Sequence, residues 1–349
     1  MVRKMFAGGN SARGFYSFFD QMFSDNIEQI FLLKGGPGTG KSHLMKNLAE
    51  YASKQGYPVE LFYCASDPDS LDGIVLPEQR AGVVDATAPH VQDPVLPGCR
   101  EEIVNLGDNW DRDVLVDAKG EIAALTRANK QAYGRAYRYL RAAEEIEELW
   151  AAVNAQSAGE QGTEKALDIL LETFGSIKPG SRRGKERHAF ATAITPQGIV
   201  SHIDELVTDY SQRWIIRCAP GTGAQEVFSA LVSAARLSGV SMEIFHRPLL
   251  PHQIEHVLFP DLGVAVLSRV EPFDLLATGT EIDLLPDQHK TEVPRRVKDL
   301  YGELLESGIA ELKEAKRIHD DLEALYIQAL DFARSNLVYE TLRSRIFGS

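Results

Sequence analysis

Two glycine-rich loops constrain the fold of this chain more than any other feature. The first reads Gly-Gly-Pro-Gly-Thr-Gly-Lys-Ser over residues 35–42, and the second reads Cys-Ala-Pro-Gly-Thr-Gly-Ala-Gln over residues 218–225. Each loop follows a short apolar segment that ends on a cation, and each precedes a segment rich in helix formers. A loop placed between a strand and a helix is typical of an open α/β sheet. The second loop keeps the turn residues but lacks the lysine and the hydroxyl of the first.

The similarity between the two halves of the chain extends well beyond the loops. With the offset between the loops held constant, Gly56 aligns with Gly239 and Phe62 with Phe245. A repeat of this length is domain-sized and much longer than the units of a solenoid protein. A chain of 349 residues is also long for a single core. We therefore expect two tandem α/β domains with mostly parallel sheets.

Boundaries for these domains follow from composition. Residues 178–185 have the Pro, Gly, Ser and Arg content of a linker, which predicts one domain over 1–180 and a second over 186–349. In the first domain, about 113–175 is rich in Ala, Glu, Arg and Leu, with a break near 157–162. We expect this region to form a helical hairpin appended to the sheet, and about 290–346 to form its counterpart in the second domain.

The first loop has the residues needed to hold a nucleotide triphosphate. It matches G-x-x-x-x-G-K-[ST] completely and has the required strand before it and helix after it. Its glycines let backbone N–H groups curl around phosphate oxygens, Lys41 can reach the β- and γ-phosphates, and Ser42 can ligate Mg²⁺. We expect a P-loop NTPase-like domain that binds ATP with Mg²⁺. The predicted nucleotide-binding residues are Gly35, Gly36, Pro37, Gly38, Thr39, Gly40, Lys41, Ser42 and His43.

Acidic residues at the ends of two further predicted strands complete the predicted site. Asp85 ends the apolar segment 81–85, and we expect it to hold Mg²⁺ together with Ser42. Asp67 or Asp69, after the strand predicted over 59–65, is a candidate for orienting the attacking water or contacting hydrated Mg²⁺, although turn formation or helix capping explains the same residues. Lys41, Asp85 and Asp67 form the predicted catalytic set. Glu78 and His90 are weaker candidates.

The second loop lacks the groups that phosphoryl transfer needs. Ala224 aligns with Lys41, Gln225 with Ser42, and the third strand of this half ends on Ser268 instead of an acid. Because a cation and a metal supply most of the charge stabilisation in this chemistry, we do not expect catalysis there. Weak phosphate binding by the retained backbone turn stays open, beside a purely structural or regulatory role.

Composition excludes several other classes of protein. The net charge of −13 argues against a general nucleic-acid surface, and no apolar run approaches the roughly 20 residues of a membrane helix. We therefore expect a cytoplasmic protein without membrane or general nucleic-acid partners. Three widely spaced cysteines do not suggest a disulfide framework. The sequence His-Gln-Ile-Glu-His at 252–256 fits a zinc motif, but a five-residue pattern of this kind also arises by chance.

The chain resembles a bacterial family of duplicated P-loop ATP-binding proteins, whose members are described as ATPases or nucleotide kinases. The resemblance rests on GGPGTGKS at 35–42, SDPDSLDG at 66–73, VVDATAPH at 83–90 and the order of the repeats. It implies ATP binding by the first half. Our leading expectation is a Mg-ATP-dependent ATPase whose second half regulates or docks. The alternatives are a nucleotide or small-molecule kinase with an unknown acceptor, and a non-hydrolysing ATP-gated module with a protein partner. A homo-oligomer is possible in each case.

Overall fold

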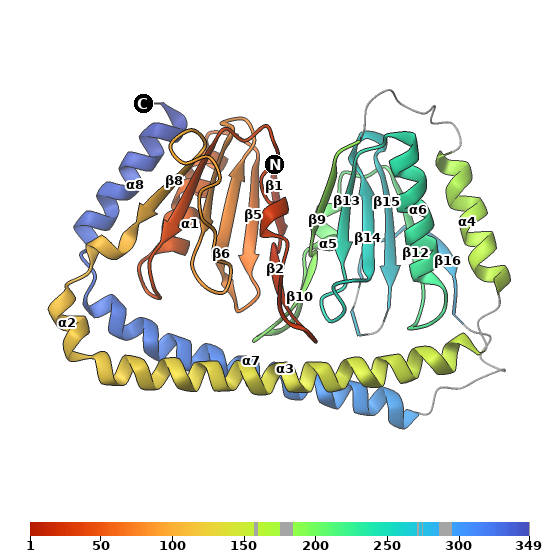
Figure 1. Cartoon of the computed structure of the whole chain (residues 1–349). Helices are drawn as coiled ribbons and strands as arrows, with labels where there is room; N and C mark the ends of the chain where they lie inside the picture. Colours follow the sequence, from red (N-terminus) through yellow and green to blue (C-terminus); the bar gives the residue numbers. More distant parts are fainter. Residues whose placement is uncertain (157–159, 175–183, 271, 274, 286–294, 349) are drawn as a thin grey trace.

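A computed structural model of the chain describes residues 1–156, 160–174, 184–270, 272–273, 275–285 and 295–348. It shows a mixed α/β fold with two similar halves (Figure 1). Of the predicted linker, residues 178–183 lie outside the described part, as do 157–159 of the predicted helix break. The predicted boundaries between 1–180 and 186–349 therefore stay a prediction. Among the described residues, no helix has both the length and the hydropathy to cross a bilayer.

The first half contains a six-stranded sheet in which five strands are parallel. Its order is β1 (Val2–Met5), β5 (Val59–Cys64), β6 (Asp67–Leu76), β7 (Ala81–Asp85), β4 (Gln29–Lys34) and β8 (Glu101–Asn105). The exception is β6, which runs antiparallel to both of its neighbours. Asp67, for which the sequence leaves turn formation or a helix cap open, begins β6 directly after a turn at Ala65–Ser66. The polar residues of this segment enter the sheet beside register shifts in β5.

The sheet of the second half has the same order and the same directions. It runs β9 (Glu186–Ala189), β13 (Met242–His246), β14 (Ile254–Phe259), β15 (Val264–Arg269), β12 (Gln212–Arg217) and β16 (Thr280–Asp283), with β14 antiparallel. A β-hairpin follows the first strand of each sheet. These hairpins are β2 (Gly8–Ser11) with β3 (Gly14–Ser17), and β10 (Thr192–Thr195) with β11 (Gly198–Ser201). The shared topology makes the two halves structural counterparts.

The two sheets pack against each other and are covered on their outer faces by helices. In β4, Ile30 and Leu32 face a core shared with the second sheet, whereas Phe31 and Leu33 face the helix α1 (Lys41–Lys54). In the sheet of the second half, side chains alternate in the same way between the shared core and the helix α6 (Ala224–Ser238). Strands with both faces buried explain the continuous apolar segments in the sequence.

Four short helices lie in the connections between these elements: η1 (Phe19–Gln21), η2 (Leu106–Asn109), α5 (Ile203–Leu206) and η3 (Pro260–Leu262).

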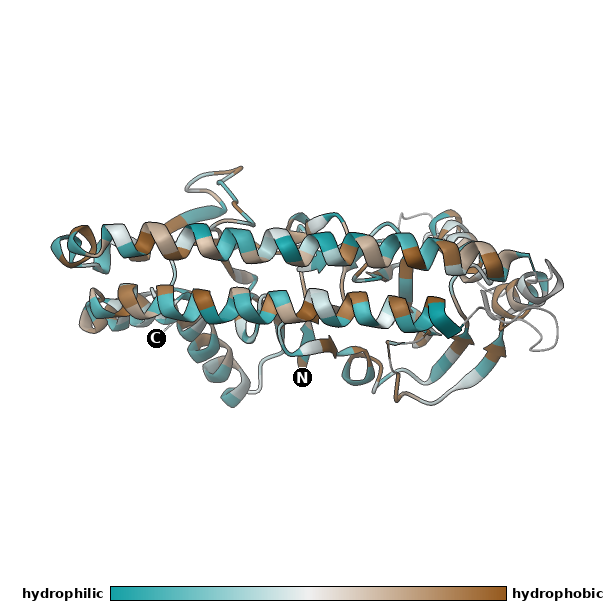
Figure 2. Cartoon of the chain, turned by 90° about the horizontal axis from the view of Figure 1, so that it is seen from below, coloured by the Kyte–Doolittle hydropathy of each residue, from teal (hydrophilic) through white to brown (hydrophobic). Residues whose placement is uncertain are grey.

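Two long helices join the halves below the sheets. After the short α2 (Arg112–Asp117), α3 (Lys119–Ala155) crosses from the first half to the second, and α7 (Arg295–Gln328) crosses back beside it (Figures 1 and 2). Leu140 of α3 and Leu312 of α7 belong to the core between these helices, and small residues such as Ala132 and Ala315 allow close approach. The predicted hairpin within each half is therefore wrong. One helix does end at Ala155 and the next begins at Glu160, near the predicted break, but α3 packs along α7 from the other half.

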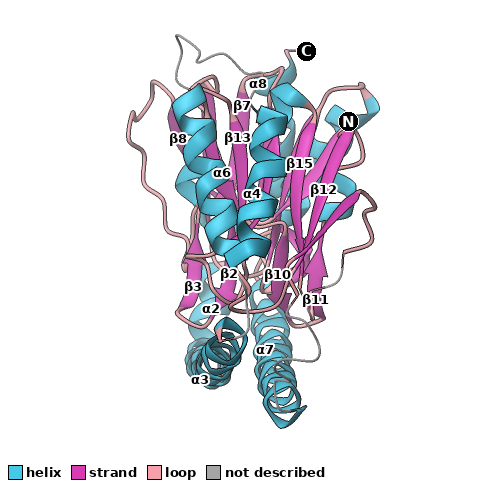
Figure 3. Ribbon diagram, turned by 90° about the vertical axis from the view of Figure 1, so that its right-hand side faces the viewer, coloured by secondary structure: helices cyan, strands magenta, loops and turns pink. Residues whose placement is uncertain are grey.

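The helix that follows each long helix packs on the opposite half. Helix α4 (Glu160–Phe174) lies beside α6 on the outer face of the second sheet (Figure 3), and α8 (Phe332–Phe347) packs near α1 on the first. Each half thus completes its outer layer with a helix from the other half's chain segment. The exchange ties the halves together, because neither sheet is fully covered by its own segment alone.

Candidate functional site

The first glycine loop has the backbone shape of an anion cradle. It connects the end of β4 to the first residue of α1, and Gly38 and Gly40 adopt left-handed conformations with φ of 69° and 82°. The buried Thr39 hydroxyl donates to the Gly36 carbonyl at 2.9 Å and closes the turn. The first N–H groups of α1 have no acceptor within the helix, so this end favours an anion.

Lys41 and Asp85 lie together, as their positions in the sequence predict. The Lys41 ammonium donates to the carbonyls of Gly35 and Gly36 at 2.7 and 2.8 Å, and it lies 3.5 Å from Asp85 Oδ2. Parallel pairing of β4 with β7 sets Asp85 beside Leu33, at the strand ends from which the loop emerges. Asp85 Oδ1 accepts from the backbone N–H and the hydroxyl of Thr87, which fixes the carboxylate.

The other predicted residues are distributed differently. The Ser42 hydroxyl accepts from the Leu71 N–H at 3.0 Å, which holds the start of α1 against β6. Asp67 accepts from the Ser70 hydroxyl at 2.7 Å and lies 3.7 Å from Lys316 of α7, so its side chain is engaged with β6 and α7. His43 is exposed and contacts Asn47 one turn further along α1. The weaker candidate Glu78 is exposed between β6 and β7.

Asp72 is the acid that the sequence analysis missed. It is 4% exposed on β6, and His90 Nε2 lies 3.7 Å from its Oδ1. Burial raises the pKa of Asp72 to about 6; His90 and Lys41 oppose that shift, whereas the charge of Asp85 adds to it. His90 is itself buried and stacks on Phe19 with ring centroids 4.5 Å apart. The only signal for Asp72 in the sequence is its place in the acidic run at 66–73.

The C-terminal end of α7 covers the first loop. Glu323 Oε1 accepts from the Gly38 N–H at 3.1 Å, and a Cβ at Gly38 would lie 2.9 Å from the Glu323 carbonyl oxygen. Beside it, the rings of Trp110 and Tyr326 lie 5.1 Å apart and approach Gly36. The second half of the chain thus contributes a carboxylate and a ring to a site whose loop belongs to the first half.

The second loop keeps its turn but not its polar groups. Gly221 and Gly223 are left-handed, with φ of 78° and 96°, and the Thr222 hydroxyl donates to the Ala219 carbonyl at 2.9 Å. Gln225 takes over the structural contact of Ser42, because it bonds both backbone groups of Ile254 on β14 at 2.8 and 2.9 Å. The end of α3 covers this loop as α7 covers the first.

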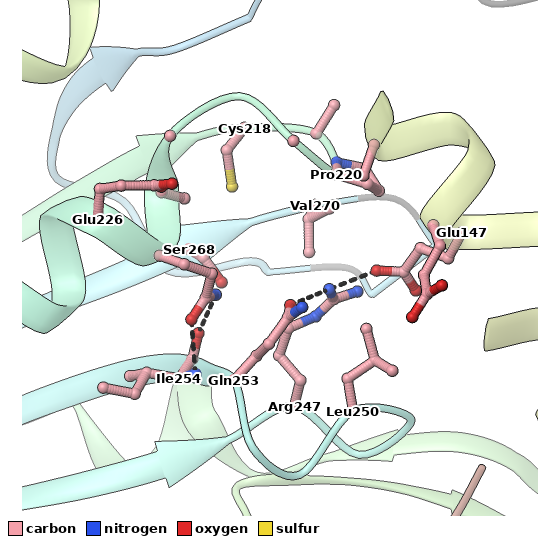
Figure 4. A pocket seen from close by; sticks show the side chains of 17 residues that line it. Glu147, Cys218, Pro220, Glu226, Arg247, Leu250, Gln253, Ile254, Ser268 and Val270 are labelled. Atoms are coloured by element: carbon pink, nitrogen blue, oxygen red, sulfur yellow. Dashed lines mark hydrogen bonds and ion pairs between the residues drawn. The ribbon is translucent and has the colours of Figure 1, made fainter. Parts of the chain in front are cut away.

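A cavity of about 280 Å³ lies between the second loop, the end of α3 and the turn after β13 (Figure 4). Among the residues that line it are Cys218, Gly221, Ala224, Gln225, Arg247 and Ser268. The zinc pattern lies next to this region, but His256 is buried in a strand and accepts from the Ser268 N–H at 3.2 Å. Within the described part of the chain, no cluster of three or more His, Cys, Asp or Glu residues could hold a metal.

Comparison with known proteins yields one partial match. A family model described as "Nephrocystin 3, N-terminal" matches residues 17–74. This segment contains the first loop, α1 and β5, and most of β6. It covers less than half of the chain and none of the second half. No curated protein and no solved structure matches the chain.

Proposed function

We propose that the first half binds Mg-ATP as a P-loop NTPase and hydrolyses it, and that the second half regulates it or docks a partner. The observation that supports this most is the meeting of Lys41 with Asp85 beneath a left-handed glycine turn at the start of α1. A cation, an acid and convergent N–H groups at the carboxyl ends of parallel strands suit a nucleotide phosphate with its metal. The proposal follows the duplicated P-loop arrangement that the sequence suggests.

The residues present fit Mg-ATP in type. The Ser42 hydroxyl and the Asp85 carboxylate are the hard oxygen donors that Mg²⁺ prefers. Lys41 now bonds the carbonyls of Gly35 and Gly36 and would turn from them to the β- and γ-phosphates. When bound, Mg-ATP supplies the phosphoryl group to be transferred and the charge that this chain's groups must stabilise.

A water-orienting acid is the remaining requirement. Of the acids in the 66–73 run, Asp72 is the one whose pKa responds to both Lys41 and Asp85, whereas Asp67 contacts Lys316 on α7. We therefore assign water orientation to Asp72. Asp67, our first choice from the sequence, is assigned to the contact between β6 and α7. A pKa of about 6 keeps most of Asp72 ionised at neutral pH, as an acceptor for a water proton requires.

Turnover with and without Lys41 tests the proposal. Lys41→Ala is expected to lower the rate of phosphate release from ATP by about a hundredfold or more, because it removes the cation that stabilises the transferring group. Lys46→Ala, an exposed lysine on the same helix, is the matched control and should leave the rate unchanged. Unchanged turnover in Lys41→Ala would exclude this site.

The same assay separates the alternatives. A kinase forms ADP only when an acceptor is added, and a binding module binds ATP with negligible turnover under both conditions. The covering of the loop by α7 is compatible with a module whose long helices respond to nucleotide. Phosphate release without an acceptor decides for the ATPase.

A further inference from the structure

The long helix α3 has one face that packs against the rest of the chain and an opposite face that is open to solvent. Its buried residues, among them Ala132, Leu140 and Trp150, recur at helical spacing and face α7 and the nearby hairpins. No described element lies in front of α3 in the view from below (Figure 2). The open face is therefore free to contact another molecule.

The residues of this open face form a single stripe along α3. They follow one another at alternating steps of four and three residues, and every one of them is exposed. The stripe consists of Arg127, Gln131, Gly134, Arg138, Arg141, Glu145, Glu148, Ala152 and Ala155. Steps of this kind keep residues in line where one helix packs along another, as in a coiled coil. The opposite side of α3 uses the same spacing to pack on α7.

The charges of the stripe are not matched within the chain. Among the described residues, α3 forms its ion pairs through Arg135 and Glu147, and neither belongs to the stripe. On the exposed side of α7, in contrast, Arg317 pairs with Glu314 and Asp321 of its own helix. The charges of the stripe are thus available to a partner molecule.

The order of these charges makes the stripe complementary to its own reverse. A second α3 laid antiparallel about position 143 places Arg141 opposite Glu145 and Arg138 opposite Glu148. Each of these pairs occurs twice, because the two copies of a two-fold symmetric dimer present the same surface to each other. A parallel arrangement in the same register would set like charges opposite each other.

The sizes of the outer residues match in the same arrangement. Opposite Gly134 the antiparallel copy presents Ala152, and opposite Gln131 it presents Ala155. Glycine is a poor helix former, and a Cβ at Gly134 would meet no atom of the chain, so the packing of the single chain does not require a glycine here. A glycine facing an alanine does allow two helices to approach closely. Leu149, which is 51% exposed beside the stripe, adds an apolar side chain to the contact.

We propose that the exposed stripe of α3 is a homodimer interface, at which a second copy of the chain packs its own α3 antiparallel about position 143. The occupant is a second copy because the stripe matches its own reverse both in charge and in size. Between positions 131 and 155 the contact extends about 36 Å along the helix. Exposed ion pairs contribute little affinity, so the charged residues set the direction and register, while close packing and the arginine stems supply the buried area.

Sedimentation of the full chain over a range of concentrations tests this proposal. We expect an equilibrium between monomer and dimer. Arg138→Glu with Arg141→Glu makes the centre of the stripe acidic, and Glu145→Arg with Glu148→Arg makes it basic. Each of these double variants should raise the dissociation constant of the dimer by about a hundredfold, because like charges then face each other.

A mixture of the two double variants gives the sharpest test. Every acid of one variant then faces a base of the other, so we expect a heterodimer whose dissociation constant is close to that of the unmodified homodimer. Recovery on mixing shows that both variants are folded and that the helices are antiparallel. Arg296→Glu with Lys313→Glu, two exposed positions on α7, changes the net charge as much as the acidic variant does and should leave the dimer intact.

Gly134→Gln tests the close approach of the helices without changing a charge. Position 134 is exposed and has room for a side chain, and glutamine is the better helix former, so the variant should fold at least as well as the unmodified chain. Its side chain would hold the two helices apart. We expect the dissociation constant of the dimer to rise by about tenfold.

Loss of the dimer in each charge variant and its recovery on mixing support the proposal. A chain that stays monomeric at every concentration overturns it, as does a dimer that no change on α3 affects. Loss of the dimer without recovery on mixing also overturns it when circular dichroism shows both variants folded. If a charge variant does not fold, the response to Gly134→Gln decides. Because no readout involves a nucleotide, each result leaves the ATPase proposal for the first half to its own test.

Discussion

Glu323 Oε1 accepts a hydrogen bond from the Gly38 N–H at 3.1 Å, which joins the end of α7 to the first glycine loop. In the proposed function this N–H belongs to the group that surrounds phosphate oxygens. A carboxylate is itself an oxyanion, so the protein's own side chain satisfies a donor that a nucleotide would use. Since α7 begins in the second half, the contact also makes the first loop sensitive to how the two halves are held together.

Removing the Glu323 carboxylate should therefore tighten nucleotide binding. We expect Glu323→Ala to lower the dissociation constant for ATP by about tenfold, because binding no longer has to break a charge-assisted hydrogen bond or face its repulsion. Glu323→Gln keeps an acceptor without the charge and should show a smaller gain. Equilibrium titration with ATP measures both.

Glu306→Ala is the control for this prediction, since Glu306 is exposed on the same helix. Its affinity for ATP should equal that of the unmodified chain. An unchanged or weaker affinity in Glu323→Ala would show that the carboxylate does not compete with the nucleotide.

A reciprocal ion-pair network connects the two sheets. Arg3 donates to Glu243 of the other half at 2.9 and 2.5 Å, and Arg187 donates to Glu60 at 3.0 and 2.8 Å. Arg3 also contacts Glu60 at 3.1 Å, and the four side chains are at most 24% exposed. Burial alone would raise the pKa of the Glu60 carboxyl, but the nearby charges of Arg187 and Arg3 hold it below its usual value.

Breaking this network should destabilise the whole chain. We expect Arg3→Ala to lower the free energy of unfolding by about 3 kcal/mol, because it removes both hydrogen bonds to the largely buried Glu243 and leaves that carboxylate with Arg187 at 3.7 Å. Adding Glu243→Ala should cost less than the sum of the two single changes. Urea unfolding of both single variants and of the double variant measures the coupling, with the exposed Arg13→Ala as the control. Strict additivity would mean that the pair contributes no coupling.

Asp85 gives a prediction specific to the metal. If Ser42 and Asp85 hold Mg²⁺, Asp85→Asn should raise the Mg²⁺ concentration for half-maximal turnover by about tenfold or more, because it removes the charged ligand while conserving shape. Asp25→Asn, at an exposed position, should leave the Mg²⁺ dependence unchanged. A lower rate with an unchanged Mg²⁺ dependence would instead assign Asp85 to the orientation of Lys41.

The sequence predicts contacts within one half better than contacts between halves. The meeting of Lys41 with Asp85 follows from a loop and an acid at the ends of two parallel strands, and these strands turn out to be neighbours. Asp72 was missed because Ser, Asp and Pro favour turns, whereas the pairing of β6 with β5 and β7 overrides that local preference.

Glu323 and Arg247 illustrate the part that could not be predicted. Helical periodicity shows that α3 and α7 have an apolar face but not which helix will cover it, so a hairpin within each half was the simplest expectation. The crossing of the long helices is what brings Glu323 to Gly38 and Glu147 to Arg247. Arg247 aligns with a cysteine, and the loop comparison therefore gave no sign of a second cation.

The buried Glu255 should make the stability of the second half depend on pH. It is 2% exposed, and burial raises its pKa to about 7, although the charge of Arg247 and a hydrogen bond from Thr192 oppose that rise. His256 lies 3.7 Å away but stays neutral, since burial lowers its pKa to about 3. The fold therefore favours protonated Glu255. This stabilisation is fully present below the unfolded-state pKa of 4.5 and is lost as the pH rises through about 7.

Glu255→Gln should accordingly change stability in a pH-dependent direction. Glutamine mimics the protonated acid, so the variant and the unmodified chain should unfold at similar urea concentrations at pH 5. At pH 8 the unmodified chain must bury a carboxylate or keep a proton that the unfolded chain has released, and the variant should be more stable by on the order of 3 kcal/mol. Other titrating groups are common to both proteins and cancel in the difference. An equal stability difference at pH 5 and pH 8 would show that Glu255 titrates normally and that the cavity wall beside Arg247 is more open to water than its burial indicates.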